Sequence, residues 1–580
     1  MKLINNLKFA WNYAKNEKKR IIIFLLCNIM HIVLYVVMPI LSAKIIIELT
    51  SNNYVRLISI ASVILFVEIL NNFIEYISRR TTMKVYQNTL SKLETDLGKN
   101  ILKLENESLD KNGSGLFIQR MTNDTSRMAD VFNSLLDMIT GIIEYVGVLV
   151  AIFIINKITF VYMVIMLILL YLLERKRTSK FNEDDRIYRK SAEKVSSFIG
   201  ELVRGTRDIK MLNSENSFIN ELSNKINDAN GKRTRMRQKT FIYRLLIHII
   251  SNLKNFILIV VLILLMEKKI IISATALILY NYSSRLSYSV TLLGNLLEYI
   301  KDFNLSCDRV YDIIYGDEFK KEKFGTLHLD KINGDFEFKN VTFAYDKKKV
   351  LDNLSFNIKA NTTVAFVGKS GSGKTTIFNL LCKMYDIKKG EITIDGINIK
   401  ELDKDSIRGN ITVISQNPYI FNMSIKDNLK IVKEGLTDND IKKACKMACL
   451  DDFVRSLPNG YDTIVGEGGV NLSGGQKQRL AIARALVQKT EIILFDEATS
   501  ALDNETQDKI QKAIENMKNE YTILIIAHRL STVINADKIM LIDNGQIIDE
   551  GNHEYLLKHS KEYQNLYETE LTNNENGTLD

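Results

Sequence analysis

A glycine-rich stretch of this 580-residue sequence lies between an apolar run and a segment with helical character. The order in TTVAFVGKSGSGKTTIFNLL (362–381) predicts a buried strand, a loop and a helix. Glycines allow backbone N–H groups to curl around phosphate oxygens, and the start of the helix adds its partial positive charge. Lys374 is expected to reach the β- and γ-phosphates of a nucleotide, and the hydroxyl of Thr375 to bind Mg²⁺. The residues expected to hold the nucleotide are Gly368, Ser370, Gly371, Ser372, Gly373, Lys374, Thr375 and Thr376.

Two carboxylates follow a second apolar run, in EIILFDE at 491–497. Asp496 ends the expected strand, where a carboxylate can bind Mg²⁺. Glu497 comes next and is placed to polarise a water molecule in line with the γ-phosphate. A third apolar run, TILIIAH at 522–528, ends on His528. That histidine could be a structural hydrogen-bond partner, but the two neighbouring phosphate-site strands favour contact with the γ-phosphate.

A second possible phosphate cradle begins at the sequence LSGGQ, which opens the helix expected over 477–487. Its serine and glycine amides form a helix start of the kind that binds phosphate. One chain does not need two cradles for one γ-phosphate. We therefore expect this segment to contact the nucleotide held by another copy of the domain, so that ATP joins two copies. The residues concerned are Leu472, Ser473, Gly474, Gly475 and Gln476.

The first half of the chain is much more apolar than the second. The run at 21–47 is nearly uncharged and long enough to cross a bilayer as a helix. The run at 158–173 lacks the polar face of a soluble helix, so lipid is its better solvent. We expect six spans, at about 21–47, 57–77, 135–155, 158–173, 241–266 and 270–293.

Basic residues gather on one side of these spans: they precede the first and fifth and follow the second and fourth. By the positive-inside rule, the N- and C-termini are then cytoplasmic. The cluster KRTRMRQK (232–239) could bind nucleic-acid phosphates, but its place at the cytoplasmic end of a span favours a role in topology. The polar intervals 78–134 and 174–240 predict long helices that extend into the cytoplasm, with reversals near Gly113 and Gly205.

Composition excludes other classes of protein. Lys and Arg total 77 against 68 Asp and Glu, and this net charge of +9 is far below that of a nucleic-acid coat, so we expect no nucleic-acid partner. The 5 cysteines include no CxxC pair, which argues against a zinc ribbon and a secreted disulfide scaffold.

The phosphate loop, LSGGQ and ILFDE, in this order behind six spans, resemble an ATP-binding cassette (ABC) exporter half-transporter of the multidrug or lipid type. The likeness covers essentially the whole chain. It implies an α-helical polytopic membrane domain over 1–316, with six transmembrane helices that have long cytoplasmic extensions. It further implies a linker over 317–334 and an α/β P-loop NTPase domain of ABC type over 335–580.

The resemblance also assigns roles to single residues. Tyr345 matches the aromatic residue that stacks on adenine, and Gln416 matches the glutamine that links Mg²⁺ and the attacking water to the membrane part. Glu497 matches the catalytic base and His528 the switch histidine, while Asp503 matches the loop that touches the opposite subunit's site. The implied catalytic set is Glu497, His528, Gln416 and Lys374, and the implied Mg²⁺ set is Thr375, Gln416 and Asp496.

The implied function is ATP hydrolysis coupled to export of an amphipathic small molecule, drug or lipid from the cell membrane, by alternating access and with ATP and Mg²⁺ as cofactors. Two ATP molecules would be sandwiched between the domains of a dimer. No motif is degenerate, which favours a homodimer over a heterodimer. An importer on the same scaffold, for example of metal chelates, and an ATP-gated channel or regulator are the alternatives. The direction of uptake into vesicles distinguishes the importer from the exporter. Ion flux without accumulation of a substrate would indicate the channel.

Four ionisable residues fall near the middle of their spans: Glu68, Glu144, Lys254 and Arg285. Such groups are costly in lipid and usually face a cavity. They are therefore candidates for a substrate pathway, with internal ion pairs or misplaced span boundaries as the alternative. The sequence leaves both open and does not identify the substrate.

Overall fold

The computed structural model describes residues 2–50, 53–286, 289–345, 348–466, 469–496, 504–518, 520–527 and 533–576. The chain forms two compact units. We call Met1–Lys103 with Asn112–Phe319 the helical unit, and Leu104–Lys111 with Lys320–Asp580 the α/β unit. The short segment Leu104–Lys111 therefore packs with residues that follow it by more than 200 positions. The fold class expected from the sequence, a helical membrane domain followed by an α/β domain, is confirmed.

Long helices dominate the helical unit, and they continue through single helix-breaking residues such as Pro39 and Gly147. They are α1 (Lys2–Ala14), α2 (Lys18–Thr50), α3 (Tyr54–Ile101), α5 (Thr125–Ile155), α6 (Lys157–Arg204), α7 (Thr206–Met211), α8 (Glu215–Glu267), α9 (Ser273–Leu286) and α10 (Ser289–Ile314), while α4 (Asn106–Gln119) starts in the α/β unit. Asn156 separates α5 from α6, and its side chain caps α6 by accepting the Thr159 N–H at 2.9 Å.

Five helical stretches of the described chain could cross a membrane by length and composition. They are Lys2–Leu49, Tyr54–Ile101, Asn106–Ile155, Lys157–Arg204 and Glu215–Glu267. These contain the first five expected spans. The sixth, 270–293, takes in α9 and the start of α10, and residues 287–288 between them lie outside the described part.

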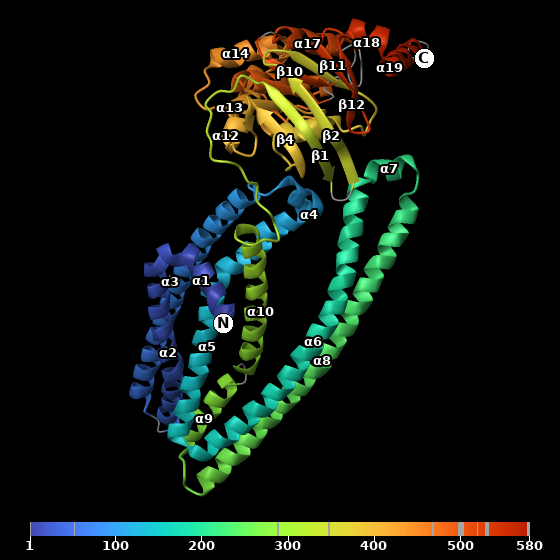
Figure 1. The fold of residues 1–580 in the computed structure, drawn as a ribbon. Coiled ribbons are helices and arrows are strands. Elements are labelled where there is room, and N and C mark those ends of the chain that lie inside the picture. The colour runs from blue at the N-terminus through green and yellow to red at the C-terminus, as the bar shows by residue number, and fades with distance from the viewer. Residues whose placement is uncertain are drawn as a thin grey trace. The chain divides into compact units, whose positions relative to one another are not determined.

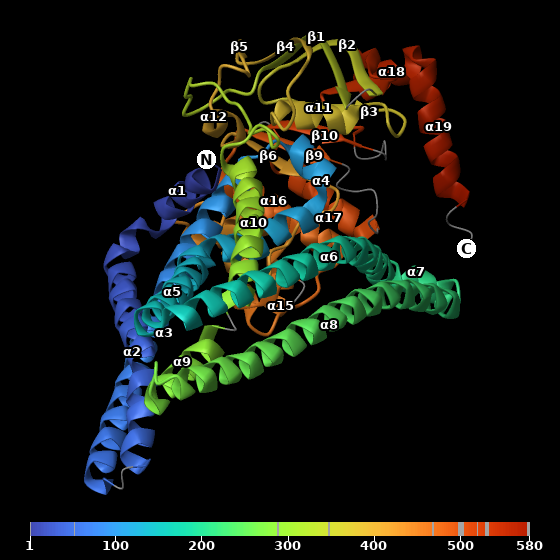
Figure 2. The same cartoon turned by 90° about the horizontal axis from the view of Figure 1, so that it is seen from below.

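Helices α6 and α8 run side by side over most of their length, and the six-residue helix α7 joins their ends (Figure 1, Figure 2). This reversal follows Gly205, as the sequence predicts. The other reversal has two breaks. The helix α3 ends at Ile101, and the backbone at Gly113 leaves helical geometry, with a φ of 67° and a ψ of 157°, as the sequence predicts for that glycine.

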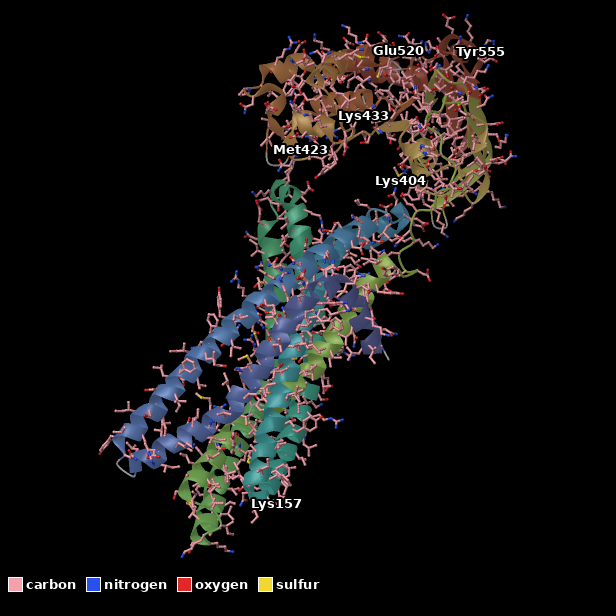
Figure 3. The ribbon with its side chains drawn as sticks, turned by 90° about the vertical axis from the view of Figure 1, so that its left-hand side faces the viewer. Lys157, Lys404, Met423, Lys433, Glu520 and Tyr555 are labelled. Carbon is pink, nitrogen blue, oxygen red and sulfur yellow. The ribbon has the colours of Figure 1, made fainter. Side chains whose placement is uncertain are left out.

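Side chains along the spans are exposed where lipid would cover them, for example Phe66, Ile154 and Ile165. The buried side of the bundle is a cluster of apolar residues from α5, α6, α8 and α9, which includes the fully buried Tyr282. Figure 3 shows Lys157, the first residue of α6, at one end of this bundle.

The α/β unit is built on a largely parallel sheet with the order β12-β11-β3-β10-β9-β6 among the described strands. These strands are β3 (Thr363–Val367), β6 (Ile411–Ile414), β9 (Ile492–Asp496), β10 (Thr522–Ile526), β11 (Lys538–Asp543) and β12 (Gln546–Gly551), of which only β12 pairs antiparallel. Central strands β3 and β10 are buried at every residue, which explains their continuous apolar sequence.

A second sheet is antiparallel, with the order β2-β1-β4-β5. Its strands are β1 (Phe336–Tyr345), β2 (Lys348–Ile358), β4 (Lys389–Ile394) and β5 (Ile397–Asn398), and the short β7 (Met423–Ser424) pairs with β8 (Ile464–Val465).

Two apolar clusters form the core, one between the two sheets and one between the parallel sheet and the helices. The helices are α11 (Lys374–Leu381), α12 (Lys404–Arg408), α13 (Ile425–Lys430), α14 (Asp438–Met447), α15 (Asp451–Ser456), α16 (Gly474–Gln488), α17 (Asn504–Glu515), α18 (His553–His559) and α19 (Lys561–Asn576).

The segment Lys320–Asp330, within the expected linker, is bound along the α/β unit. Glu322 accepts two hydrogen bonds from the guanidinium of Arg408, at 2.6 and 3.0 Å. The same guanidinium lies 5.1 Å from the ring centroid of Phe324. We call this bound segment the strap.

Candidate functional site

The parallel sheet brings the expected nucleotide residues to one edge. β10 pairs parallel with both β3 and β9, and β6 pairs parallel with β9. The carboxyl ends of these strands therefore point the same way. The glycine-rich loop follows β3, Asp496 ends β9, and Gln416 comes two residues after β6. Ligands of open α/β sheets bind at this edge.

The glycine-rich loop leads into α11, with Gly373 as its N-cap at a φ of 105°. A side chain is strained at that φ, and a Cβ there would lie 2.7 Å from Leu351 Cδ2, so only glycine fits. Lys374 is 4% exposed, and its ammonium donates to the carbonyls of Gly368 at 2.8 Å and Lys369 at 2.9 Å. The ammonium thus lies inside the loop.

Ser372 and Thr376 of the loop are buried, whereas Ser370, Gly371 and Thr375 are exposed. The hydroxyl oxygen of Ser372 is buried without a hydrogen-bond partner among the described residues. Buried polar atoms normally have a partner. A buried hydroxyl without a hydrogen-bond partner at this position fits a loop whose polar groups bind phosphate.

Thr375 and Asp496 meet across the loop: the Thr375 hydroxyl donates to Asp496 Oδ1 at 3.2 Å. Hydroxyl and carboxylate oxygens are the ligands that Mg²⁺ prefers, so the residues present fit the ion. Thr375 and Asp496 would hold it, with Gln416 as a further ligand. When bound there, the ion would supply positive charge that offsets the negative charge of the phosphates.

Tyr345, the expected adenine platform, is the last described residue of β1. Its ring packs edge-on against Tyr385 at 5.1 Å between centroids, and its hydroxyl accepts from the Asn379 amide at 3.3 Å. Asn379 is on α11, so the tyrosine lies beside the helix that begins at the phosphate loop.

A cavity of about 360 Å³ opens beside Tyr345. Tyr385 lines it together with Asp110, which accepts a 2.8 Å hydrogen bond from the Tyr385 hydroxyl. Burial, and then the neighbouring carboxylate of Asp110, raise the pKa of Tyr385 above its usual value. Sequence reasoning did not find Tyr385 or Asp110. Neither belongs to a motif, and only the fold brings them together.

LSGGQ begins helix α16 with a reciprocal cap. The Ser473 hydroxyl accepts from the Gln476 N–H at 3.3 Å, and Gln476 Oε1 accepts from the Ser473 N–H at 2.8 Å. Ser473 and Gly474 are exposed, whereas Leu472 is part of the core. Further along the helix, Gln478 donates to the carbonyl of Gln416 at 3.3 Å.

Three expected site residues, Glu497, Asp503 and His528, lie outside the described residues. The flanking strands β9 and β10 end at Asp496 and Ile526, at the same edge of the sheet as the phosphate loop.

In the helical unit, the four mid-span charges have different surroundings. Glu68 and Arg285 line a cavity of about 740 Å³. Glu144 lies 3.6 Å from the Nε2 of His31, another lining residue. Lys254 is 1% exposed and donates to the Ser283 carbonyl at 3.1 Å.

Comparison with known proteins defines the class of protein with this fold and site. The family model "ABC transporter transmembrane region" matches residues 21–284, and "ABC transporter" matches residues 351–500. The ATP-dependent lipid A-core flippase of Photobacterium profundum is 31% identical over 82% of this chain and 82% of its own length. That of Haemophilus influenzae (strain 86-028NP) is 32% identical over 88% of each chain. The uncharacterized ABC transporter ATP-binding protein YknV of Bacillus subtilis is 29% identical over 97% of this chain and 94% of its own.

A solved structure of a bacterial Atm1-family ABC exporter with ATP bound has the same fold, with a TM-score of 0.84 at 23% identity over 95% of this chain and 99% of its own. The chain belongs to the ABC transporter family. It is a half-transporter of the exporter type, which couples ATP hydrolysis to transport across a membrane. The resemblance expected from the sequence is confirmed.

Proposed function

We propose that this chain exports an amphipathic small molecule, drug or lipid across the cell membrane by alternating access. The observation that carries the proposal is the common edge of the parallel sheet, where the phosphate loop, Asp496 and Gln416 follow three strands of one direction. A cavity in the helical unit with both polar and apolar lining supports an amphipathic substrate. Relatives named as lipid A-core flippases support a lipid-like one.

The catalytic roles follow the chemistry of each group. Lys374 binds the β- and γ-phosphates, and Thr375, Gln416 and Asp496 hold Mg²⁺. Glu497 polarises the attacking water as general base, and His528 contacts the γ-phosphate. Tyr345 stacks on adenine.

Two identical chains form the transporter. The exposed start of α16 at Ser473 and Gly474, together with Asp503, contacts the nucleotide bound by the other chain. Because every motif is intact, both composite sites hydrolyse ATP. Six spans cross the membrane, the sixth over 270–293, and both termini are cytoplasmic. The membrane domain covers 1–316 and the nucleotide-binding domain 335–580.

The test is ATP-driven transport in proteoliposomes of the full chain, with a fluorescent short-chain phospholipid as probe. Only transporters whose nucleotide-binding domains face outward meet added ATP, so export moves the probe from the outer to the inner leaflet. Glu497→Gln should keep ATP binding and abolish steady-state turnover, whereas Lys374→Ala should weaken ATP binding. Movement of the probe in the opposite direction would indicate an importer, and normal turnover by Glu497→Gln would remove that residue from its role.

A further inference from the structure

We propose that Glu68 recognises a cationic centre in the transported molecule. The inference rests on the proposed function and deepens it, because it names the charge of the substrate. Glu68 lies on α3, near the middle of the expected span 57–77, and its side chain is exposed and lines the cavity of the helical unit.

The other mid-span charges already have partners inside the protein. Arg285 donates to the carbonyl of Tyr35 at 2.9 Å, and its guanidinium lies 4.3 Å from the centroid of the Tyr35 ring. Glu144 faces His31, and Lys254 is bound to the Ser283 carbonyl. These contacts lower the cost of a charge in a membrane span.

Glu174, the other carboxylate that lines the cavity, is also paired. The guanidinium of Arg177, one turn further along α6, donates to both of its oxygens, at 2.5 and 2.9 Å. Such a bidentate pair is among the strong charge-assisted hydrogen bonds. Its carboxylate is therefore not available to a ligand without breaking this pair.

Glu68 differs from all of these. In the part of the chain that the structure describes, its carboxylate makes no hydrogen bond and no ion pair. One turn along α3, Asn71 lines the same cavity, and its Oδ1 lies 2.7 Å from Nδ1 of His31. Residues three apart share a helix face, so Glu68 is on the face of α3 that points into the cavity.

The carboxylate of Glu68 gives the sign of the ligand. Of the two carboxylates that line the cavity, that of Glu174 is held by Arg177, and the lining guanidinium of Arg285 is held by Tyr35. Glu68 is thus the lining carboxylate without a partner among the described residues. Low-dielectric walls strengthen the field of such a charge, which favours a cation.

Charge is the means of recognition that the cavity offers most directly. Tyr35 is the tyrosine among its lining residues, and Arg285 already lies over one face of that ring. Apolar side chains such as Leu34, Met38 and Leu170 line the same cavity and suit the rest of an amphipathic molecule. The structure thus assigns an amphipathic cation as the preferred ligand.

The experiment uses two probes of nearly the same shape and opposite charge, tetraphenylphosphonium and tetraphenylborate. Binding to the full-length protein in nanodiscs is measured by equilibrium dialysis without nucleotide, with empty nanodiscs as background. We expect the phosphonium to bind about tenfold more tightly than the borate, as an opposite charge in a partly screened site provides. Glu68→Gln should remove most of this preference, and Glu68→Asp should retain most of it.

Glu75→Gln is the matched control. Glu75 is on the same helix, pairs with Arg79 at 2.7 Å and does not line the cavity, so its loss should leave the preference unchanged. Retained ATP binding shows that each variant is folded. If Glu68→Gln does not fold, the comparison of the two probes on the unchanged protein still tests whether the cavity prefers a cation.

Equal or tighter binding of the borate by the unchanged protein, or an unaltered preference in a folded Glu68→Gln, would overturn the inference. These results leave the proposed function standing, because ATP-driven movement of the phospholipid probe is measured separately. Loss of that movement in the unchanged protein would instead count against the proposed function.

Discussion

The hydroxyl of Tyr385 donates a 2.8 Å hydrogen bond to the carboxylate of Asp110, across 275 residues of sequence. Tyr385 also packs edge-on against Tyr345. The segment Leu104–Lys111, which lies between the expected spans 57–77 and 135–155, is in this way attached to the tyrosine that we propose stacks on adenine. Further backbone pairing, from the N–H of Glu105 to the carbonyl of Lys320 at 2.9 Å, fixes the start of the same segment.

Tyr385→Phe should weaken this attachment, because it removes the donor and keeps the ring against Tyr345. The expected cost is about 0.5–1.5 kcal/mol, the net value of one partly exposed hydrogen bond. Hydrogen exchange of Leu104–Lys111 should rise in the variant, and ATP should protect the segment less. Tyr555→Phe is the control, since Tyr555 is an exposed tyrosine far from the cavity in sequence (labelled in Figure 3). Unchanged exchange in Tyr385→Phe would show that the bond does not hold the segment.

Asp496→Asn should raise the Mg²⁺ concentration needed for half-maximal ATPase activity by about tenfold or more. The amide is a weaker ligand, and it no longer carries the charge that balances the cation. Thr375→Ser keeps the hydroxyl that donates to Asp496 and should stay close to the unchanged protein, whereas Thr375→Val should resemble Asp496→Asn. ATPase titrations with Mg²⁺ check this. An Asp496→Asn curve that matches the unchanged protein would remove Asp496 from the proposed Mg²⁺ set.

Arg408→Lys should loosen the strap. Lysine cannot reproduce the two parallel hydrogen bonds to Glu322 or the planar contact with Phe324. Both charged side chains are largely covered, at 20% and 11% exposure, so we expect a loss of about 1–2 kcal/mol. In a domain of this size that shifts the thermal midpoint by about 2–4 °C per kcal/mol. Thermal unfolding of the full chain in detergent measures it, and an unaltered midpoint would mean that the strap is held by its other contacts.

His328 should make strap binding depend on pH. Its Nδ1 lies 2.7 Å from a carboxylate oxygen of Asp403, and this hydrogen bond raises the pKa of His328 above its usual value. The contact between protonated His328 and Asp403 then contributes its full stabilisation below the unfolded-state pKa of about 6.5. This stabilisation is lost as the pH rises through the higher folded-state pKa. Asp403, whose pKa is lowered to about 2 chiefly by hydrogen bonds from Ser406, stays ionised throughout this window.

The effect is small because His328 is on the surface. We expect the difference in thermal midpoint between the unchanged protein and His328→Gln to shrink from pH 6 to pH 8.5. A difference that grows with pH would contradict the direction of the pKa shift.

Local patterns were enough to predict the phosphate loop. A strand, loop and helix over 362–381 are set by neighbours in sequence, so the apolar run and the glycines predicted β3 and α11 correctly. The Ser473–Gln476 cap is equally local, since its two partners are three residues apart. The first five spans were predictable because the apolar runs have no polar face.

Other features depended on residues far apart. The break at Gly113 was predicted, but a second one, at Leu102–Glu105, was not, and there Leu104 bridges to Lys321. No local pattern encodes a pairing across more than 200 residues. Of the mid-span charges, the sequence could not tell Glu68 from Lys254, because their spacing along the spans is similar.

The sequence by itself determined the class of protein and the order of its domains, and it predicts the groups that handle ATP, because all of these depend on short segments whose local conformation and chemistry are fixed by adjacent residues. Only the tertiary structure decided that Lys254 is satisfied internally while Glu68 faces a cavity, and that Tyr385 binds Asp110. Burial and pairing of a side chain depend on which distant helices and strands pack around it, and that packing exists only in the folded chain.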